Sequence, residues 1–533
     1  MDRRTFVGRA GLGAGALILG GVPVWPDSTL AKRRNKIGFA GDGVFTEGIA
    51  SGEPAPNGIT LWTRLGGHER DRKLTLEVAR DKDFAKVIHR EVVIAQKKRD
   101  HTIRKRVHGR KLLKPGEQYF YRFETSRRGS EVGRFRTALP ADSREPVRVA
   151  FFSCQDFQAG FYGAHQAIAG TDDLDLVICL GDYIYERNFY AGPRTDTTGA
   201  NGDGEVQTLG EYRSKYRLYR SDPDLRAMHA AHPFVHIPDD HEVEDNWAGA
   251  HPGEATLRVR VPFLERRTNA FAALSEYMPI RPIPKQRYRF YRKLALGRNA
   301  DVLLLDERQY RDDQPCGDRA LAPPCPEADA PGRTFLGAEQ KQWLKDELRA
   351  SQATWKLIGN QLMVMSLDAP APGNPFIVDS WDGYGAERTE LLSFIRANDI
   401  RDVAFLTGDI HTFWAGHVKV NGRSGDVVAS EFVGGSISSL GAPEAVGKTL
   451  GNPPLTKEQI QIFTDTDVMG ANPHFVYQDQ GRRGYGVLEA SEHELRVEFK
   501  GVNALVRTPN AQTIGSFRVR SGNPHVEVLG KVV

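Results

Sequence analysis

The sequence predicts an α/β protein preceded by a small all-β domain. In residues 40–140, apolar and polar side chains alternate over short runs such as Leu74–Ala79, and turn residues such as Lys114–Glu117 separate these runs. Beyond Pro146, short apolar runs alternate with longer segments whose apolar residues recur at helical spacing. This alternation favours a parallel or mixed sheet with helices packed outside it.

The chain is 533 residues long, which exceeds one ordinary core and predicts more than one domain. We expect an export signal at 1–31, an immunoglobulin-like or fibronectin-like β-sandwich at 40–140, the main domain at 146–510 and a C-terminal tail at 511–533. The Pro-containing stretch 139–146 is the expected linker.

Each expected element follows from its local pattern. Strands are predicted where β-branched and aromatic residues alternate or form short apolar runs, and helices where the apolar spacing is three to four residues. In the first domain the expected strands are 59–63, 74–79, 91–94 and 119–124. In the main domain the expected strands are 147–152, 174–180, 232–238, 300–306, 355–361, 402–406, 486–489 and 494–499, and the expected helices are 161–169, 210–231, 261–278, 337–351 and 387–397. The Gly- and Pro-rich stretches 191–204 and 435–472 are expected to be loops over the functional edge of the sheet.

The N-terminus has the features of a twin-arginine export signal. Arg3 and Arg4 precede a Gly- and Ala-rich apolar run, and small residues at 29–31 offer a cleavage site. The run is too short and too rich in glycine for a membrane span. We therefore expect the twin-arginine machinery to export the protein to the periplasm or the extracellular space, with no transmembrane anchor after cleavage.

The net charge of +4 is small for this length and argues against a nucleic-acid-binding domain, which usually has a concentrated basic face. The densest basic stretch, 97–106, is expected to be a solvated strand or loop face.

The four cysteines differ in their sequence context. Cys316 and Cys325 lie in a Pro-rich loop and are expected to form a disulfide in an exported protein, with a zinc knuckle as the alternative. Cys179 lies in an apolar strand and is expected to be an inert thiol. Cys154 follows a strand directly and needs another explanation.

Four predicted strands end in residues that can bind metals. Cys154 follows the first, and Asp182 and Tyr185 follow the second. Strand ends of one parallel sheet converge in space, so we expect these side chains to meet. Taken alone, Asp182 is also compatible with a helix cap and Tyr185 with a core position. The remaining two strand ends supply Asp239, Asp240, His241, Asp409 and His411.

These residues, in this order, resemble the PhoD-like alkaline phosphatases, which belong to the calcineurin-like metallophosphoesterases. The resemblance covers nearly the whole chain and is carried by LGDYIYE, DDHEVEDNW, LDERQYR and TGDIHTFWAG. The family pattern Ser-Gly-Asp-Pro is here Ser-Gly-Glu-Pro at 51–54. The resemblance implies a four-layer α/β/β/α metallophosphoesterase core and a site that holds one ferric iron together with calcium.

Matched residue by residue, the resemblance implies that Cys154, Asp182, Tyr185 and His411 are the iron ligands. Asp182 would bridge to the second metal. A phenolate and a carboxylate suit a hard trivalent ion, whereas a thiolate is a softer ligand beside them.

The same matching assigns the calcium side and the substrate contacts. Asp240 and Asp409 match calcium ligands, and Asn246 is a possible further one. Arg187 matches an arginine that holds phosphate, and His241 matches a histidine near the leaving group. We treat the stretch 306–310 as structural support, with an ion pair under the site, and Asn360 as a residue that could reach the cleft.

The expected function is hydrolysis of phosphate monoesters or diesters by a metal-activated hydroxide. Phospholipase D-like or teichoic-acid-type phosphodiesterase activity on the same site is one alternative. A thiol hydrolase with Cys154 as nucleophile and His165 or His241 as base is a second. A non-catalytic surface or ligand-binding protein is a third.

Overall fold

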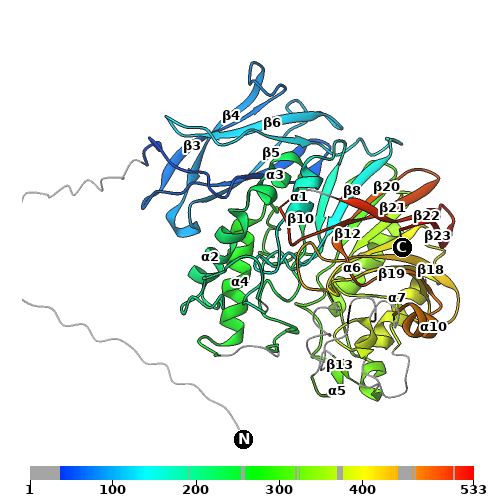
Figure 1. Ribbon diagram of the computed structural model, residues 1–533. Helices are drawn as coiled ribbons and strands as arrows, with labels where there is room; N and C mark the ends of the chain where they lie inside the picture. The colour runs from blue at the N-terminus through cyan, green and yellow to red at the C-terminus, as the bar shows by residue number, and fades with distance from the viewer. Residues whose placement is uncertain are drawn as a thin grey trace, which may run out of the picture. The chain divides into compact units, whose positions relative to one another are not determined.

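Two large β-sheets form the centre of the computed structural model (Figure 1). The structure describes residues 37–532 except 190, 254–257, 319–320, 323–324, 369–375, 442–455, 457–458, 460–463 and 508–510. The export signal expected at 1–31 lies outside these residues. No helix in this described part is both long enough and apolar enough to cross a membrane.

The first sheet has ten strands, and its three neighbouring strands β8, β9 and β10 run parallel. Its strands in spatial order are β23 (Asn523–Lys531), β22 (Gln512–Arg520), β21 (Glu494–Val502), β20 (Arg483–Ala490), β8 (Val147–Phe152), β9 (Leu176–Cys179), β10 (Pro233–His236), β1 (Ile49–Ala55), β2 (Gly58–Arg64) and β5 (Thr102–His108).

The second sheet has seven strands, of which β12, β14, β16 and β18 run parallel. Its strands in spatial order are β11 (Arg292–Leu296), β12 (Ala300–Leu304), β14 (Trp355–Gly359), β16 (Val403–Thr407), β18 (Val427–Gly434), β17 (Phe413–Lys419) and β19 (Phe475–Asp479).

Smaller elements complete the described part. A four-stranded sheet has the order β4 (Val87–Ala95), β3 (Arg72–Ala79), β6 (Gln118–Glu124) and β7 (Gly133–Arg136), and β13 (Leu321–Ala322) pairs with β15 (Phe376–Ile377). The helices are α1 (Gly163–Ala169), α2 (Leu209–Arg220), α3 (Pro223–Ala231), α4 (Phe263–Tyr277), α5 (Pro315–Asp318), α6 (Gly337–Ala350), α7 (Gly385–Ala397) and α10 (Met469–Ala471).

Side-chain alternation in the central strands divides the hydrophobic core. In β8, Val149 and Phe151 join a core with side chains of the seven-stranded sheet, including Leu357 of β14. Ala150 and Phe152 point to the opposite face and pack with residues of α1 to α4. Because successive strand residues face opposite sides, apolar runs such as β8 are buried on both faces.

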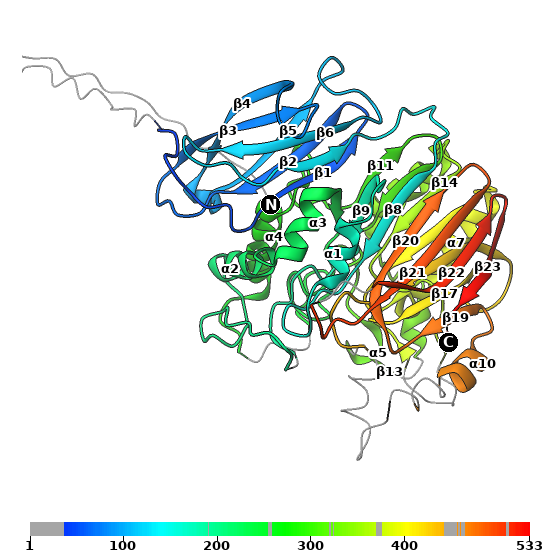
Figure 2. The same cartoon turned by 45° about the horizontal axis from the view of Figure 1, so that its top comes forward.

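The first β region is not a separate sheet pair. β1 pairs in parallel with β10, with Ser51 opposite Pro233, so β1, β2 and β5 extend the ten-stranded sheet. The four-stranded sheet packs on them around a common core that includes Leu61 and Tyr121 (Figure 2). Local alternation shows which face of a strand is buried but not its partner, so this long-range pairing could not be read from the sequence.

The segment expected as a C-terminal tail forms β22 and β23 of the ten-stranded sheet. Phe517 and Val519 alternate with partly exposed residues and join the core between the two large sheets. The boundary expected at residue 510 therefore does not separate a tail from this sheet.

The single helix expected at 210–231 is two helices. The side chain of Asp222 accepts hydrogen bonds from the amides of Asp224 (2.9 Å) and Leu225 (3.2 Å), which caps α3. Pro223 occupies the first position of α3, where its missing N–H has no helical partner to lose. These two residues end α2 and begin a new helix.

The loop cysteines Cys316 and Cys325 form the expected disulfide, with their Cα atoms 5.8 Å apart. The bond excludes a zinc knuckle built on these two residues. Cys154 and Cys179 are free and buried.

Candidate metal centre

The candidate ligands follow the carboxyl ends of four strands from both large sheets. Cys154 follows β8, Asp182 follows β9 and Asp240 follows β10 in the ten-stranded sheet, whereas His411 follows β16 of the seven-stranded sheet. The expectation that one parallel sheet supplies all four ends is therefore wrong. The sheets pack face to face, so their strand ends share one rim.

The backbone at these strand ends is unusual. Cys154 (φ 57°), Asp182 (φ 55°), Asp409 (φ 68°) and His411 (φ 58°) all adopt positive φ values, which are uncommon for residues other than glycine. Such strain persists where the surrounding structure enforces it, often at functional sites. It turns each chain sharply just beyond its strand.

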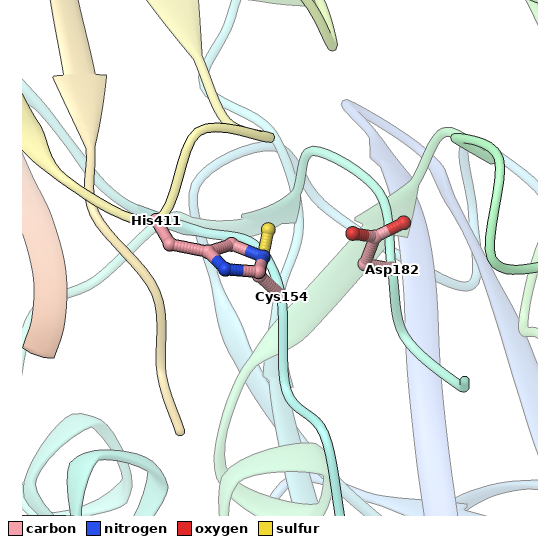
Figure 3. A group of neighbouring side chains, drawn as sticks. All are labelled: Cys154, Asp182 and His411. Atoms are coloured by element: carbon pink, nitrogen blue, oxygen red, sulfur yellow. The ribbon is translucent and has the colours of Figure 1, made fainter. Parts of the chain in front are cut away.

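Three overlapping groups of side chains could each hold a cation. The first is Cys154, Asp182 and His411, the second Asp182, Asp240 and His241, and the third Asp239, Asp240 and Asp409; within each group the candidate ligand atoms lie within 4.8 Å of one another. Figure 3 shows the first group, with Asp182 facing Cys154 and His411. Asp182 and Asp240 each belong to two groups, as a carboxylate shared between two metals would.

Tyr185 lies beside the first group. Its hydroxyl donates to Oδ2 of Asp182 (3.2 Å), lies 3.0 Å from Nε2 of His411 and accepts from Ser439 (2.7 Å). Nδ1 of His411 lies 2.7 Å from the carbonyl oxygen of Leu440, so Nδ1–H donates there and Nε2 is left for a ligand. Burial lowers the pKa of His411 to about 4, which favours the neutral imidazole that metals bind.

Three carboxylate oxygens in the centre lack hydrogen-bond partners although they are buried: Oδ1 of Asp182, Oδ2 of Asp239 and Oδ1 of Asp240. Buried charges without partners are unfavourable. Burial raises the pKa of Asp182 and Asp409 well above the usual range, and that of Asp239 to about 7, because neighbouring carboxylates add to the effect. These residues fit bound cations, which would supply the missing partners.

Arg308 supplies positive charge beneath the acidic groups. Its guanidinium donates to Asp239 (2.6 Å) and Asp379 (2.7 Å), and Nη2 lies 3.6 Å from oxygens of Asp240 and Asp409. This is the ion pair expected from the stretch 306–310. Arg311 also pairs with Asp379 at 2.6 Å. Two guanidinium groups thus face four carboxylates, and bound cations could balance the remaining negative charge.

His241 is held at the second group by neighbours on two sides. Its Nδ1 lies 2.8 Å from Oε2 of Glu186, and its ring stacks on Tyr185 with centroids 4.1 Å apart. Burial alone would lower its pKa, but Asp240, Asp182 and Glu186 raise the pKa of His241 well above the usual range.

Two further residues expected at the site lie at its border. Arg187 packs over the ring of Phe189 at 4.1 Å and pairs with Asp245 at 3.3 Å. The backbone amide of Asn246 donates to Oδ2 of Asp240 at 2.7 Å, and the residue has a positive φ of 57°. Asn246 thus fixes Asp240 through its main chain, in addition to any role of its side chain.

Glu242 supports the candidate centre and was not among the residues expected from the sequence. Its buried carboxylate accepts the amides of Asp182 (3.2 Å), Tyr183 (2.7 Å) and Asp239 (2.7 Å), and Nε2 of His236 lies 2.9 Å away. It therefore ties the turns after β9 and β10 together. The sequence signal was an acidic side chain within DDHEVEDNW, in a turn whose backbone N–H groups need hydrogen-bond acceptors when they are buried.

Cys154 and His165 of the thiol-hydrolase alternative do not form a catalytic pair, because each contacts another side chain. Sγ of Cys154 contacts Oγ of Ser153 at 3.0 Å, and burial raises its pKa well above the usual range. Nε2 of His165 bonds Oε1 of Gln155 at 2.6 Å, and burial lowers the pKa of His165 to about 3.

Asn360, which was expected to reach the cleft, is fully buried, and its amide donates to the carbonyl of Leu362.

Comparison with known proteins agrees with this geometry. Residues 149–499 match the family model of the PhoD-like phosphatase, and residues 32–139 match that of the PhoD-like phosphatase N-terminal domain. The chain is 35% identical to alkaline phosphatase D of Bacillus subtilis (strain 168) over 529 residues, which cover 96% of this chain and 86% of the relative.

Solved structures show the same relationship. A structure of PhoD superposes with a TM-score of 0.80 at 31% identity and covers 92% of each chain. A purple acid phosphatase from yellow lupin (Lupinus luteus) seeds has a TM-score of 0.53 at 12% identity, covering 89% of this chain and 73% of its own, and is a likeness of fold alone. The chain therefore belongs to the PhoD-like phosphatase family and is a hydrolase of phosphoric ester bonds.

Proposed function

We propose that the chain is an exported, metal-dependent phosphoesterase whose catalytic centre is the set of strand-end residues described above. One observation carries the proposal. Three buried carboxylate oxygens, on Asp182, Asp239 and Asp240, have no hydrogen-bond partner and lie within overlapping groups of metal-binding side chains.

Two cation positions fit the donor atoms. Cys154, Asp182, Tyr185 and His411 would hold the first, and anionic oxygen donors beside a thiolate suit ferric iron. A metal at this position would also hold the buried thiol as its thiolate.

Asp182, Asp240 and Asp409 would hold the second cation, with Asn246 as a further oxygen donor. A position supplied mainly by carboxylate and amide oxygens suits calcium. Asp239, which already accepts from Arg308, has one free oxygen and would complete this set.

Bound at these positions, a pair of cations would hold the phosphate oxygens and lower the pKa of a water molecule. His241 would donate a proton from Nε2 to the leaving oxygen; in support, its Nδ1 already contacts Glu186. Arg187 would offer its guanidinium to the non-bridging phosphate oxygens. Glu186 and Tyr185 keep the imidazole of His241 in place.

The substrate class that this centre fits is a phosphate monoester or diester, because both present the same reacting group. Phospholipids and teichoic-acid-type polymers belong to the diester class, and the loop 191–204 is the described segment that we expect to select among them. We further propose the four-layer α/β/β/α order for the core. Three hydrophobic clusters support this order. The first joins α1 to α4 with the ten-stranded sheet, the second lies between the two large sheets, and the third joins α6 and α7 with the seven-stranded sheet.

The direct test of this proposal is Asp182→Asn. The variant keeps the size of the side chain and removes the charge shared by two groups, so hydrolysis of p-nitrophenyl phosphate and bis-p-nitrophenyl phosphate should fall at least about a hundredfold. Circular dichroism should be unchanged. Asp346→Asn, on the exposed face of α6, is the matched control. Normal turnover by Asp182→Asn would exclude this centre.

A further inference from the structure

A polar cavity lies at the β5 edge of the ten-stranded sheet. It has a volume of about 420 Å³ and is lined by residues of the edge strand β5 and of the C-terminal end of α4. No residue of the metal centre lines it. Its lining residues are Lys98, Arg99, Thr102, Arg104, Ser275, Glu276 and Arg287.

The lining carries four cationic side chains and a single carboxylate. That carboxylate, on Glu276, is bound at both oxygens by Arg213, with Nε–Oε2 and Nη2–Oε1 distances of 2.8 Å. Among the described residues, no carboxylate lies within 4.0 Å of Lys98, Arg99 or Arg287. The cavity therefore has an excess of positive charge that the protein itself does not neutralise.

Two carbonyl oxygens near the end of α4 already accept hydrogen bonds. Arg104 donates to the carbonyl oxygen of Ser275, and the indole N–H of Trp62 donates to that of Glu276 at 2.7 Å. Burial, together with the nearby charges of Arg99 and Arg287, lowers the pKa of Arg104 to about 10. Several cationic side chains around one cavity create a positive potential that attracts an anion.

We propose that this cavity is an anion site for phosphoryl groups, taken either as free phosphate or as one phosphate of a longer phosphate-bearing polymer. Guanidinium forks match the oxygens of a tetrahedral oxyanion, and three arginines surround one space. Arg99 and Arg287 are exposed at the mouth, whereas Arg104 lies deeper and is fixed by Ser275. The site needs no metal and does not depend on the proposed catalytic role of the centre.

The test is equilibrium binding of inorganic phosphate to the metal-loaded protein at low ionic strength. Wild type should bind one phosphate at this cavity. In Arg99→Gln/Arg287→Gln the affinity for that phosphate should fall by about tenfold or more. Inhibition of catalysis by phosphate reports the metal centre and should be unchanged. The variant should fold normally, because neither side chain makes an ion pair among the described residues.

A second arm distinguishes the two sources of phosphate. If polymer docks here, Arg99→Gln/Arg287→Gln raises KM for a short poly(glycerol phosphate) but not for p-nitrophenyl phosphate. If free phosphate is the ligand, both KM values stay constant while phosphate binding is lost. The matched control is Arg127→Gln/Arg298→Gln, which removes two exposed arginines that do not line the cavity. Equal binding of phosphate and of polymer by wild type and variant, or an equal loss in the control, overturns the proposal.

Discussion

Nδ1 of His241 lies 2.8 Å from Oε2 of Glu186, and this contact decides which imidazole nitrogen is free. A carboxylate at this distance accepts a hydrogen bond from Nδ1–H and leaves Nε2 for substrate or metal. Carboxylates that orient an imidazole in this way tune its basicity and hold its tautomer. Glu186 is thus a positioning residue for the proposed proton donor.

Glu186→Gln should lower kcat by about tenfold or more with a smaller change in KM, because the amide no longer holds the imidazole as the carboxylate does. The pH profile of kcat should shift with it, since the carboxylate stabilises the protonated ring. Kinetics over a pH series checks both effects. Glu265→Gln, on the exposed side of α4, is the control; equal kcat and pH profiles in wild type and Glu186→Gln would remove the positioning role.

Glu242→Gln should both destabilise the fold and weaken metal binding at the candidate centre. Three backbone amides donate to the Glu242 carboxylate, and a glutamine side chain would direct an NH₂ group at one of them. We expect the free energy of unfolding to fall by about 2–3 kcal/mol and metal content to fall in the folded protein. Denaturant unfolding and elemental analysis measure these effects. An unchanged midpoint with full metal content would contradict the role assigned to Glu242.

Tyr185→Phe removes the hydroxyl group and keeps the aromatic ring, so it tests the two contributions separately. The phenyl group should keep its stacking on His241, whereas the hydroxyl contacts with Asp182, His411 and Ser439 are lost. If the first cation is ferric iron bound by phenolate, its visible charge-transfer band should weaken or move in the variant. Tyr288→Phe is the control. A coloured wild type whose spectrum is identical in Tyr185→Phe would exclude the phenolate ligand.

The buried neutral histidines predict acid sensitivity. Burial, reinforced by the charge of Arg134, lowers the pKa of His232 to about 4. Its unfolded pKa is about 6.5, so the unfolded chain binds the proton more readily. The stability contribution is therefore complete above about pH 6.5 and is lost as the pH falls towards 4.

His232→Gln removes this contribution while its amide can still donate to the carbonyl of Ile168, which His232 contacts at 3.0 Å. The loss of unfolding free energy between pH 7.5 and pH 5 should be smaller in the variant by about 2 kcal/mol. His493→Gln, at an exposed position, should keep the slope of wild type. A His232→Gln variant with an unaltered slope would show that His232 does not titrate on unfolding.

The main domain was the most predictable part of the fold, because its strands are buried on both faces. Runs such as Val147–Phe152 and Val403–Thr407 are mostly apolar and end in polar turns, which sets their limits closely. The pairing of β1 with β10 and the addition of β22 and β23 to the same sheet depend on contacts distant in sequence. Alternation alone does not name such partners.

The clustering of Asp182 and His411 was predictable, because both are metal-binding residue types that directly follow a predicted strand. The supporting residues were harder to find. Ser439 and Leu440 lie in a Gly-rich loop with no pattern of its own, yet they contact Tyr185 and His411. Asp239 was seen only as a neighbour of Asp240, and its place in the third group depends on a turn that the sequence does not specify.

The most direct measurement is elemental analysis of the purified protein beside its Asp182→Asn variant, with activity measured on the same samples. We predict stoichiometric iron and calcium in the active wild type, and loss of both metal and turnover in Asp182→Asn. An active wild-type protein with only trace metal would contradict the central claim that these strand ends hold a pair of cations.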